Sequence, residues 1–345
     1  MAWGSRVAEY LKLARSFNLA LTAVAPVFGA LAMGERSLLP LLQLFVVGAG
    51  AHIYGFVLND YLDMKIDRLS EDLKERPLVS GSVSPGAALA FALSGLGLML
   101  GLGWAMVAGY PRAFVVLLIA VLLATIYNLI SKHLPGMDIF VASAVFFLCV
   151  FGAVTVARDI LYVSRLAWIV CGLGGLQVLF MNVVAGGLKD IDHDSRGGAR
   201  TLAVAMGCRV VGRDNRLEIP GFFRALAYTI QLLFIIALFS PFVLGLLPRE
   251  GWPLPGWFLP VLLAVLLAGS AAMLAVSGLL LNQRRFVRDR MRRLIGTHYI
   301  LNYILVPVML VALEPWILVL SVVPPLGFAL SNLALSGGAM RPATM

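Results

Sequence analysis

Charge and cysteine are both scarce in this chain. Only 13% of its 345 residues are charged and 60% are hydrophobic, with a mean hydropathy of +0.92. An ordinary soluble domain carries about 25% charged residues, so the composition excludes that class. The three cysteines have no metal-ligand spacing, which argues against a disulfide framework or a zinc site. Most of the chain must therefore face lipid.

Apolar runs long enough to cross a bilayer recur along the whole sequence. A membrane-spanning helix needs about 20 mainly apolar residues, and continuous runs favour helices over the alternating pattern of a strand barrel. We expect an all-α membrane protein with a bundle of nine or ten transmembrane helices. The number depends on the C-terminal part, where Glu314-Pro315 should interrupt a helix and leave either one long broken helix or two short ones. The expected spans are residues 17–34, 38–59, 86–109, 112–131, 138–157, 165–187, 225–247, 257–281, 296–313 and 316–335.

Basic residues are distributed unevenly between the two sides of these spans. With the N-terminus inside, 21 of the 27 lysines and arginines fall in the segments on that side and five on the other. The positive-inside rule then places loops 60–85 and 188–224 in the cytoplasm. The net charge of +9 directs topology and matches anionic lipid headgroups, so we expect no nucleic-acid partner. Residues 1–16 predict an amphipathic helix on the membrane surface rather than a signal peptide.

Aspartates gather where two of the expected spans reach the cytoplasmic side. Asp60, Asp63 and Asp67 follow the second span and fall on one face of a helix, and Asp190 and Asp194 follow the sixth span in the same way. Carboxylates stacked on one face repel each other unless a cation binds them. Oxygen ligands with a phosphate partner are what Mg²⁺ prefers. We therefore predict that these five aspartates are metal ligands and catalytic residues of one site.

The two clusters also suggest how the chain is built. Asp190 follows Asp63 by 127 residues, roughly the length of four helices, which indicates two four-helix repeats. An alternative is that each cluster is a solvated helix end whose acids balance nearby lysines and arginines. Two such clusters in a chain with only 18 acidic residues favour a paired functional site.

The motifs resemble those of a known family. The stretch Asn59–Asp67 is similar to the NDxxDxxxD motif of the UbiA superfamily of intramembrane prenyltransferases, and Asp190–Asp194 is similar to its second DxxxD motif. Residues 76–81, with the sequence RPLVSG, and residues 197–202, with the sequence GGARTL, resemble the segments that come after the two motifs in the family.

Two further resemblances depart from the family pattern. Arg15 and Asn18 resemble its Arg-Pro-x-Asn sequence, but Ser16 replaces the proline. Tyr127 and Lys132 resemble a Tyr and Lys pair at the end of the fourth span, with a separation of five residues where four are expected.

The resemblance implies one transmembrane prenyltransferase domain over residues 1–345, with loops 60–85 and 188–224 as cytoplasmic caps. It implies Mg²⁺-dependent transfer of a polyprenyl group from an allylic prenyl diphosphate to a lipophilic acceptor, with diphosphate released. The acceptor would be an aromatic quinone precursor or an archaeal glyceryl ether lipid. The expected substrate-binding residues are Arg15, Asn18, Asn59, Arg68, Arg76, Tyr127, Lys132, Lys189 and Arg200.

The competing function is a cation- or proton-coupled membrane transporter, which also uses carboxylates and internal repeats. A transporter would place its acids near the middle of the bilayer. This chain places them at the cytoplasmic ends of helices, beside arginines suited to phosphate. The sequence therefore favours the enzyme, and it leaves the acceptor, the prenyl length and the oligomeric state open.

Overall fold

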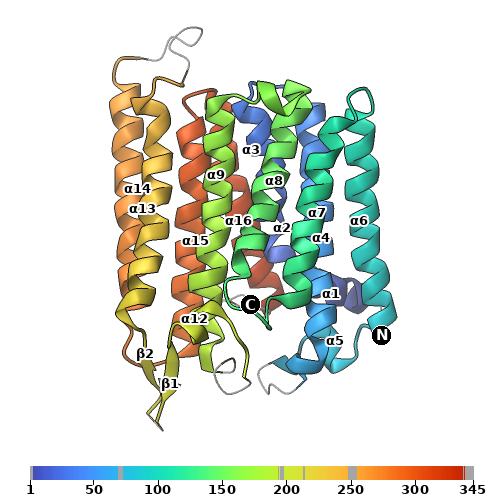
Figure 1. Cartoon of the computed structure of the whole chain (residues 1–345), viewed down its shortest axis with the longest axis vertical. Coiled ribbons are helices and arrows are strands. Elements are labelled where there is room, and N and C mark those ends of the chain that lie inside the picture. Colours follow the sequence, from blue (N-terminus) through green and yellow to red (C-terminus); the bar gives the residue numbers. More distant parts are fainter. Residues whose placement is uncertain are drawn as a thin grey trace. The chain divides into compact units, whose positions relative to one another are not determined.

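The computed structural model describes residues 3–68, 73–192, 194, 198–212, 214–247, 255–336 and 338. Helices dominate this part of the chain (Figure 1), as the composition predicts. The contacts divide it into two units. The first unit holds residues up to Ile130, Phe147–Val163 and the chain from Leu326 on. The second unit holds Ser131–Phe146 and Ser164–Pro325.

Within the described residues, nine helical segments are long and apolar enough to cross a membrane. This confirms the expected helical membrane bundle, whereas the internal repeat stays a prediction. The segments are α4 (Leu38–Asp67), α6 (Pro85–Val107), α7 (Arg112–Ile130), α8 (Asp138–Ala157), α9 (Arg165–Phe180) with its continuation to Lys189, α13 (Gly221–Val243), α14 (Phe258–Leu281), α15 (Arg288–Leu310), and the 3₁₀ turn Pro315–Ile317 with α16 (Leu318–Ser336).

The segment that decides between nine and ten spans lies at the N-terminal end. The sequence had suggested that it would lie at the C-terminal end. Helix α1 (Trp3–Leu13) is followed by α2 (Ser16–Ala23) and α3 (Ala25–Ala32). The segment from residue 6 to residue 13 is bent by 47° against the segment from 16 to 32. A tenth crossing results if this bent pair is counted as one span. The expected N-terminal helix is thus confirmed, and its place on the membrane surface stays a prediction.

Glu314-Pro315 separates two full helices, α15 and α16, which settles the doubt about the last run. Pro324 lies inside α16 and cannot donate a backbone hydrogen bond to the carbonyl of Leu320. The hydroxyl of Tyr303 donates to that carbonyl instead, at 3.0 Å. The proline is therefore tolerated because a neighbouring helix satisfies the freed group.

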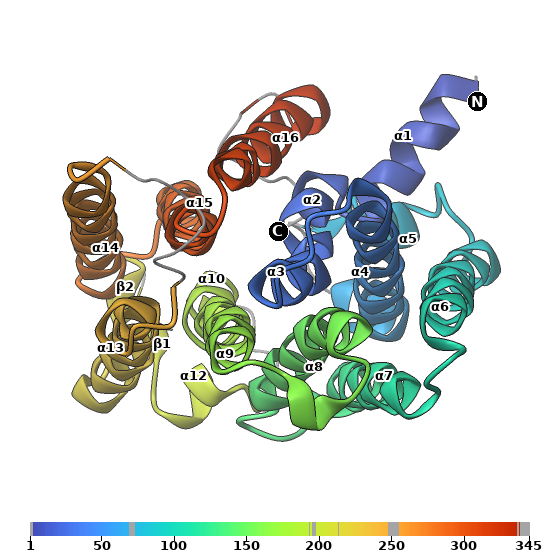
Figure 2. The same cartoon turned by 90° about the horizontal axis from the view of Figure 1, so that it is seen from above.

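Close backbone contacts hold the first unit together. Helix α4 packs with α2, α3, α6 and α7 around it (Figure 2). A side chain at Gly152 of α8 would meet the backbone carbonyl of Pro26, and one at Gly29 would meet that of Cys149. The two helices approach so closely because both glycines lack a side chain, as in many membrane helix pairs.

In the second unit, α9 packs beside α13, and α14 beside α15 (Figure 2). A buried polar group joins these helices. The amide nitrogen of Gln231 contacts the hydroxyl of Ser277 and lies 2.9 Å from Nε2 of His298, whose ring stacks on Phe180 at 4.3 Å. Such bonds fix the register of helices that lipid alone would not order.

The long loop 188–224 contains a hairpin that the sequence does not predict. Strand β1 (Arg209–Val211) pairs antiparallel with β2 (Arg216–Glu218). The hairpin is tied to the segment before α15, because the Leu217 amide donates to the Arg284 carbonyl at 3.0 Å and the Phe286 amide donates to the Asn215 carbonyl at 2.8 Å. Parts of the expected cap loops, residues 69–72, 193, 195–197 and 213, lie outside the described residues.

Short helical turns complete the loops: α5 (Pro77–Ser80), η2 (Ile160–Tyr162) and α12 (Leu202–Ala205). The three cysteines, Cys149, Cys171 and Cys208, are buried and unbridged. They therefore pack in the interior of the protein.

Candidate active site

The first aspartate cluster occupies the last two turns of α4. The helix continues without a break to Asp67, so Asp60, Asp63 and Asp67 share the face that their spacing predicts. Asp60 and Asp67 are buried, with 5% and 4% of each residue's surface exposed, whereas Asp63 and Asn59 are half-buried. Buried carboxylates at a helix end need counter-charges.

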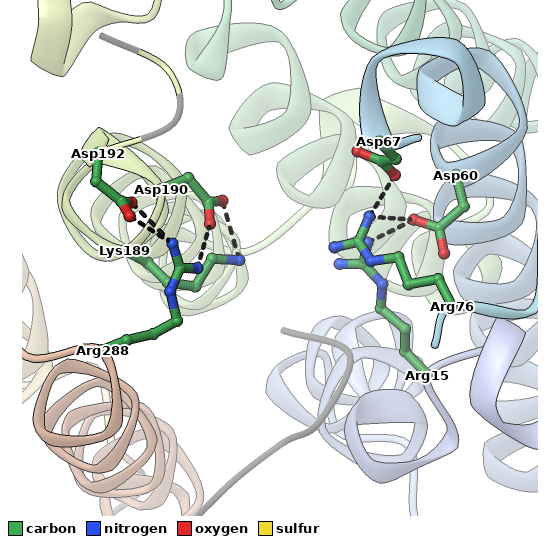
Figure 3. Close-up of polar contacts among 8 residues, drawn as sticks. All are labelled: Arg15, Asp60, Asp67, Arg76, Lys189, Asp190, Asp192 and Arg288. Atoms are coloured by element: carbon green, nitrogen blue, oxygen red, sulfur yellow. Dashed lines mark hydrogen bonds and ion pairs between the residues drawn. The ribbon is translucent and has the colours of Figure 1, made fainter. Parts of the chain in front are cut away.

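Two arginines from other elements of the same unit supply these counter-charges (Figure 3). An Nη atom of Arg15, between α1 and α2, lies 2.6 Å from Asp60. An Nη atom of Arg76, directly before α5, lies 2.6 Å from Asp67 and 3.7 Å from Asp60. Both arginines come from segments that the family resemblance singled out, and the structure brings them to the predicted carboxylates.

Arg15 is held in an unusual backbone conformation. Its φ is 46°, in the left-handed region that a non-glycine residue seldom adopts. Its guanidinium also lies 5.0 Å from the centre of the Phe56 ring. Backbone strain of this kind tends to occur at functional sites. Asn18, one turn further on, is buried, and its Oδ1 has no hydrogen-bond partner among the described residues.

The second cluster comes after α9, beyond a change of helix type. Residues Met181–Gly186 form a π-helix, and α10 (Gly187–Lys189) leads from it to Asp190. A π-helical turn shifts the register of the residues after it and is frequent at functional sites. The Asp194 amide donates to the Asp190 carbonyl at 2.9 Å, so the predicted helical turn between the two aspartates is present.

Lys189 and Arg288 place positive charge beside the second cluster (Figure 3). Nζ of Lys189 lies 3.2 Å from Asp190. Arg288, at the first position of α15, donates to both carboxylate oxygens of Asp192 at 2.8 and 2.9 Å and lies 3.9 Å from Asp190. Sequence reasoning missed Arg288, because it is one of six arginines between residues 281 and 295 that act together as a topology signal.

The remaining expected residues are Arg68, Arg200, Lys132 and Tyr127. Arg68 is exposed, with its guanidinium 3.6 Å from the sulfur of Met64 on the same helix. The Arg200 amide donates to the Lys132 carbonyl at 3.1 Å, which brings together two candidates from distant parts of the sequence. Tyr127 lies half-buried near the end of α7.

The donor chemistry of both clusters suits Mg²⁺. Within the described residues, no three His, Cys, Asp or Glu side chains form a group that could hold a metal by themselves. Mg²⁺ does not require such a group, because it is usually bound by one or two carboxylates, water and substrate phosphates. Carboxylates with adjacent arginines offer ligands for the metal and for the phosphate.

Comparison with known proteins decides the family. The sequence profile of the UbiA prenyltransferase family matches residues 22–295. This chain belongs to that family. Digeranylgeranylglyceryl phosphate synthase of Methanopyrus kandleri is 31% identical over 273 residues, which cover 78% of this chain and 89% of the relative. A 4-hydroxybenzoate octaprenyltransferase of Xanthomonas campestris is 30% identical over 184 residues, covering 49% and 58%.

A solved structure supports the same fold. A UbiA homologue from Archaeoglobus fulgidus, bound to GPP and Mg²⁺, has a TM-score of 0.62 at 16% identity, over 89% of this chain and 99% of that one. The UbiA family member described here is thus a prenyltransferase and an integral membrane protein.

Proposed function

We propose that this enzyme transfers a polyprenyl group from an allylic prenyl diphosphate to a lipophilic acceptor and releases diphosphate. The observation that carries the proposal is that each UbiA-type aspartate cluster has cationic side chains placed directly on it: Arg15 and Arg76 on the first, Lys189 and Arg288 on the second. Carboxylates beside cations are what a Mg²⁺–diphosphate complex needs.

The expected metal ligands are Asp60, Asp63, Asp67, Asp190 and Asp194. Mg²⁺ held by these carboxylates would supply positive charge that stabilises the diphosphate as the allylic C–O bond breaks. The cationic side chains bind the remaining phosphate oxygens. The electron pair of the broken bond leaves with diphosphate. The acceptor forms a new bond to the allylic carbon, and the proton that it loses passes to the released diphosphate or to water. No protein nucleophile is required.

An allylic cation requires an environment that contains little water, and the apolar helices provide it. The acids lie in the last turns of α4 and directly after α10, at helix ends. A coupled transporter would place them near the bilayer centre, so the observed positions favour the enzyme.

For the acceptor we propose either a glyceryl ether phosphate or an aromatic carboxylate of the quinone-precursor class. Relatives of both types are similar to this chain, and both acceptors combine an apolar or aromatic body with an anionic group. Arg15 offers a positive charge for such an anionic group, and Oδ1 of Asn18, which has no partner among the described residues, offers an acceptor for a hydroxyl of the same molecule.

We further propose that residues 1–345 act as one catalytic domain with its site on the cytoplasmic side and with loops 60–85 and 188–224 as caps. The distribution of basic residues supports the orientation. The bonds that tie the hairpin to residues 284–286 support an ordered cap.

The test is a product screen with purified protein in detergent. One prenyl diphosphate, geranylgeranyl diphosphate, is offered with geranylgeranylglyceryl phosphate or 4-hydroxybenzoate, and products and diphosphate are measured by mass spectrometry and a phosphate assay. We expect a prenylated product from one acceptor, abolished by EDTA and restored by Mg²⁺. No product from either acceptor, with protein that remains folded, would contradict the proposal.

A further inference from the structure

Arg288 contacts two aspartates near the second cluster at different distances. Its guanidinium is bound closely to both oxygens of Asp192, at 2.8 and 2.9 Å, and loosely to Asp190, at 3.9 Å. The Arg288 and Asp192 side chains are both only 16% exposed, whereas Asp190 is 41% exposed. The guanidinium also lies 5.6 Å from the centre of the Phe286 ring. Asp192 and Phe286 therefore hold Arg288 in place beside a more accessible carboxylate.

The first cluster also contains an arginine with two unequal contacts, although there both carboxylates are buried and Asp60 is also bound by Arg15. Arg76 lies 2.6 Å from Asp67 and 3.7 Å from Asp60, so it too has one close and one loose carboxylate. A guanidinium can bind a carboxylate with one edge and a phosphate with the other, because its donors are fixed in a planar fork. An arginine that is held by one aspartate can therefore break its contact with a second aspartate and still keep its position.

We propose that Arg288 is a diphosphate-binding residue of the second cluster that shares with Lys189 the role of counter-ion of Asp190 in the ligand-free protein and turns to the diphosphate when Mg²⁺ takes that carboxylate. The inference rests on the proposed function and adds to it how the binding of metal and the binding of diphosphate depend on each other. Asp192, which lies off the predicted metal-binding face, anchors Arg288 and is not itself a metal ligand. Metal and diphosphate bind together, because each takes over one partner of a pre-existing ion pair.

This role predicts that removing the charge of Arg288 changes the affinities for two ligands in opposite directions. A positive charge near Asp190 disfavours a metal cation, so Arg288→Gln should raise the affinity for Mg²⁺ alone by about three- to tenfold. The same change removes a donor to phosphate, so the affinity for inorganic pyrophosphate at saturating Mg²⁺ should fall by about tenfold or more. A residue that only supports the fold would weaken both affinities, and a topology signal would change neither.

The experiment is calorimetric titration of the purified full-length protein in detergent, first with Mg²⁺ alone and then with inorganic pyrophosphate in saturating Mg²⁺. Arg290→Gln is the matched control, because Arg290 is exposed on the same helix two positions later. We expect both of its affinities to equal those of the wild type. Arg288→Lys keeps the charge and loses the fork, so it should retain the wild-type affinity for Mg²⁺ alone and lose affinity for pyrophosphate.

A second variant tests the anchor. In Asp192→Asn, Arg288 loses its close partner and turns fully to Asp190, so the affinity for Mg²⁺ alone should fall although Asp192 is not a ligand. Adding Arg288→Gln to Asp192→Asn should raise the affinity for Mg²⁺ alone to that of Arg288→Gln, because Asp192 acts only through Arg288, and a double-mutant cycle measures this coupling. Additive effects of the two changes in the cycle, parallel weakening of both ligands in Arg288→Gln, or no binding of either ligand by the wild type would each overturn the proposal.

These binding results are separable from the proposed reaction. An opposite-sign response in Arg288→Gln, together with a wild-type protein that makes no prenylated product, would contradict the proposed transfer and leave the role of Arg288 standing. A protein that makes product, with both affinities weakened in Arg288→Gln, would contradict only the role of Arg288.

Discussion

Arg15 and Asp60 form an ion pair with a 2.6 Å contact although they are 45 residues apart in the sequence. The pair joins the N-terminal helices to the last turns of α4, and both side chains are largely buried. The strained backbone of Arg15 is thus tied directly to the first aspartate cluster.

Breaking this pair should destabilise the protein, because it leaves one buried charge without a counter-charge. We expect Asp60→Asn to cost about 3–5 kcal/mol in the free energy of unfolding. Combining it with Arg15→Gln should recover part of that loss, since neither charge then remains. The measurement is chemical denaturation in a mild detergent, followed by tryptophan fluorescence. Equal stability of Asp60→Asn and the wild type would mean that water compensates the charge.

The glycine contact between α3 and α8 gives a second prediction. Gly152→Ala places a methyl group against the Pro26 carbonyl, where backbone must move, and should cost about 1–3 kcal/mol. Gly101→Ala in α6 is the matched control, since its methyl group would meet no atom within 4 Å. Alanine there should be neutral or stabilising by about 0.5–1 kcal/mol, because glycine is a poor helix former. Thermal unfolding in detergent compares the two, and equal effects would contradict the close packing.

Cys208 should be inert to thiol reagents at neutral pH. Burial raises the pKa of its thiol to about 12, although the positive charge of Arg224 opposes the shift. Because only the thiolate reacts, the folded protein should stay unlabelled at this position from pH 7 to pH 9. Denaturation exposes the thiol and returns its pKa toward about 8.5, so labelling should then be fast. Mass spectrometry after maleimide treatment measures both, and rapid labelling of the folded protein would show that the loop opens.

The proposed cap loops should become more ordered when substrate binds. Arginine–phosphate contacts order mobile segments, so backbone amides near Arg76 and Arg200 should exchange with deuterium more slowly with Mg²⁺ and a non-hydrolysable prenyl diphosphate analogue. Hydrogen exchange followed by mass spectrometry, on peptides covering residues 73–83 and 198–208, measures this. Asp63→Ala should cancel the protection. Unchanged exchange in the wild type would identify the loops as passive connections.

The membrane spans could be predicted from the sequence because bilayer thickness fixes the length of an apolar run. Boundaries were less accurate where charged residues continue a helix beyond the apolar part. Helix α15 begins at Arg288, whereas its apolar run predicts a start at residue 296. The proline at 315 was correctly expected to break a helix, but periodicity alone could not show that a complete helix comes after it.

The sequence predicts the parts of the site that depend on spacing within one helix. The face shared by Asp60, Asp63 and Asp67 results from the helical repeat. The pairing of Arg288 with Asp192 spans 96 residues, and the docking of the hairpin on residues 284–286 depends on tertiary contacts. No local pattern encodes either. The π-helix before Asp190 was also missed, because the apolar run through Met181–Gly186 looks like any other helix.

The most direct test of the account is the turnover of Asp63→Ala and Asp190→Ala with a prenyl diphosphate, Mg²⁺ and the acceptor found in the screen. One reaction that uses both clusters predicts a loss of at least about a hundredfold in each variant, because each loses charge stabilisation of the departing diphosphate. Asp214→Ala, an exposed aspartate beside the hairpin turn, should keep wild-type turnover. Near-normal turnover of either cluster variant, in protein that is folded and membrane-inserted, would contradict the claim that both clusters serve one reaction.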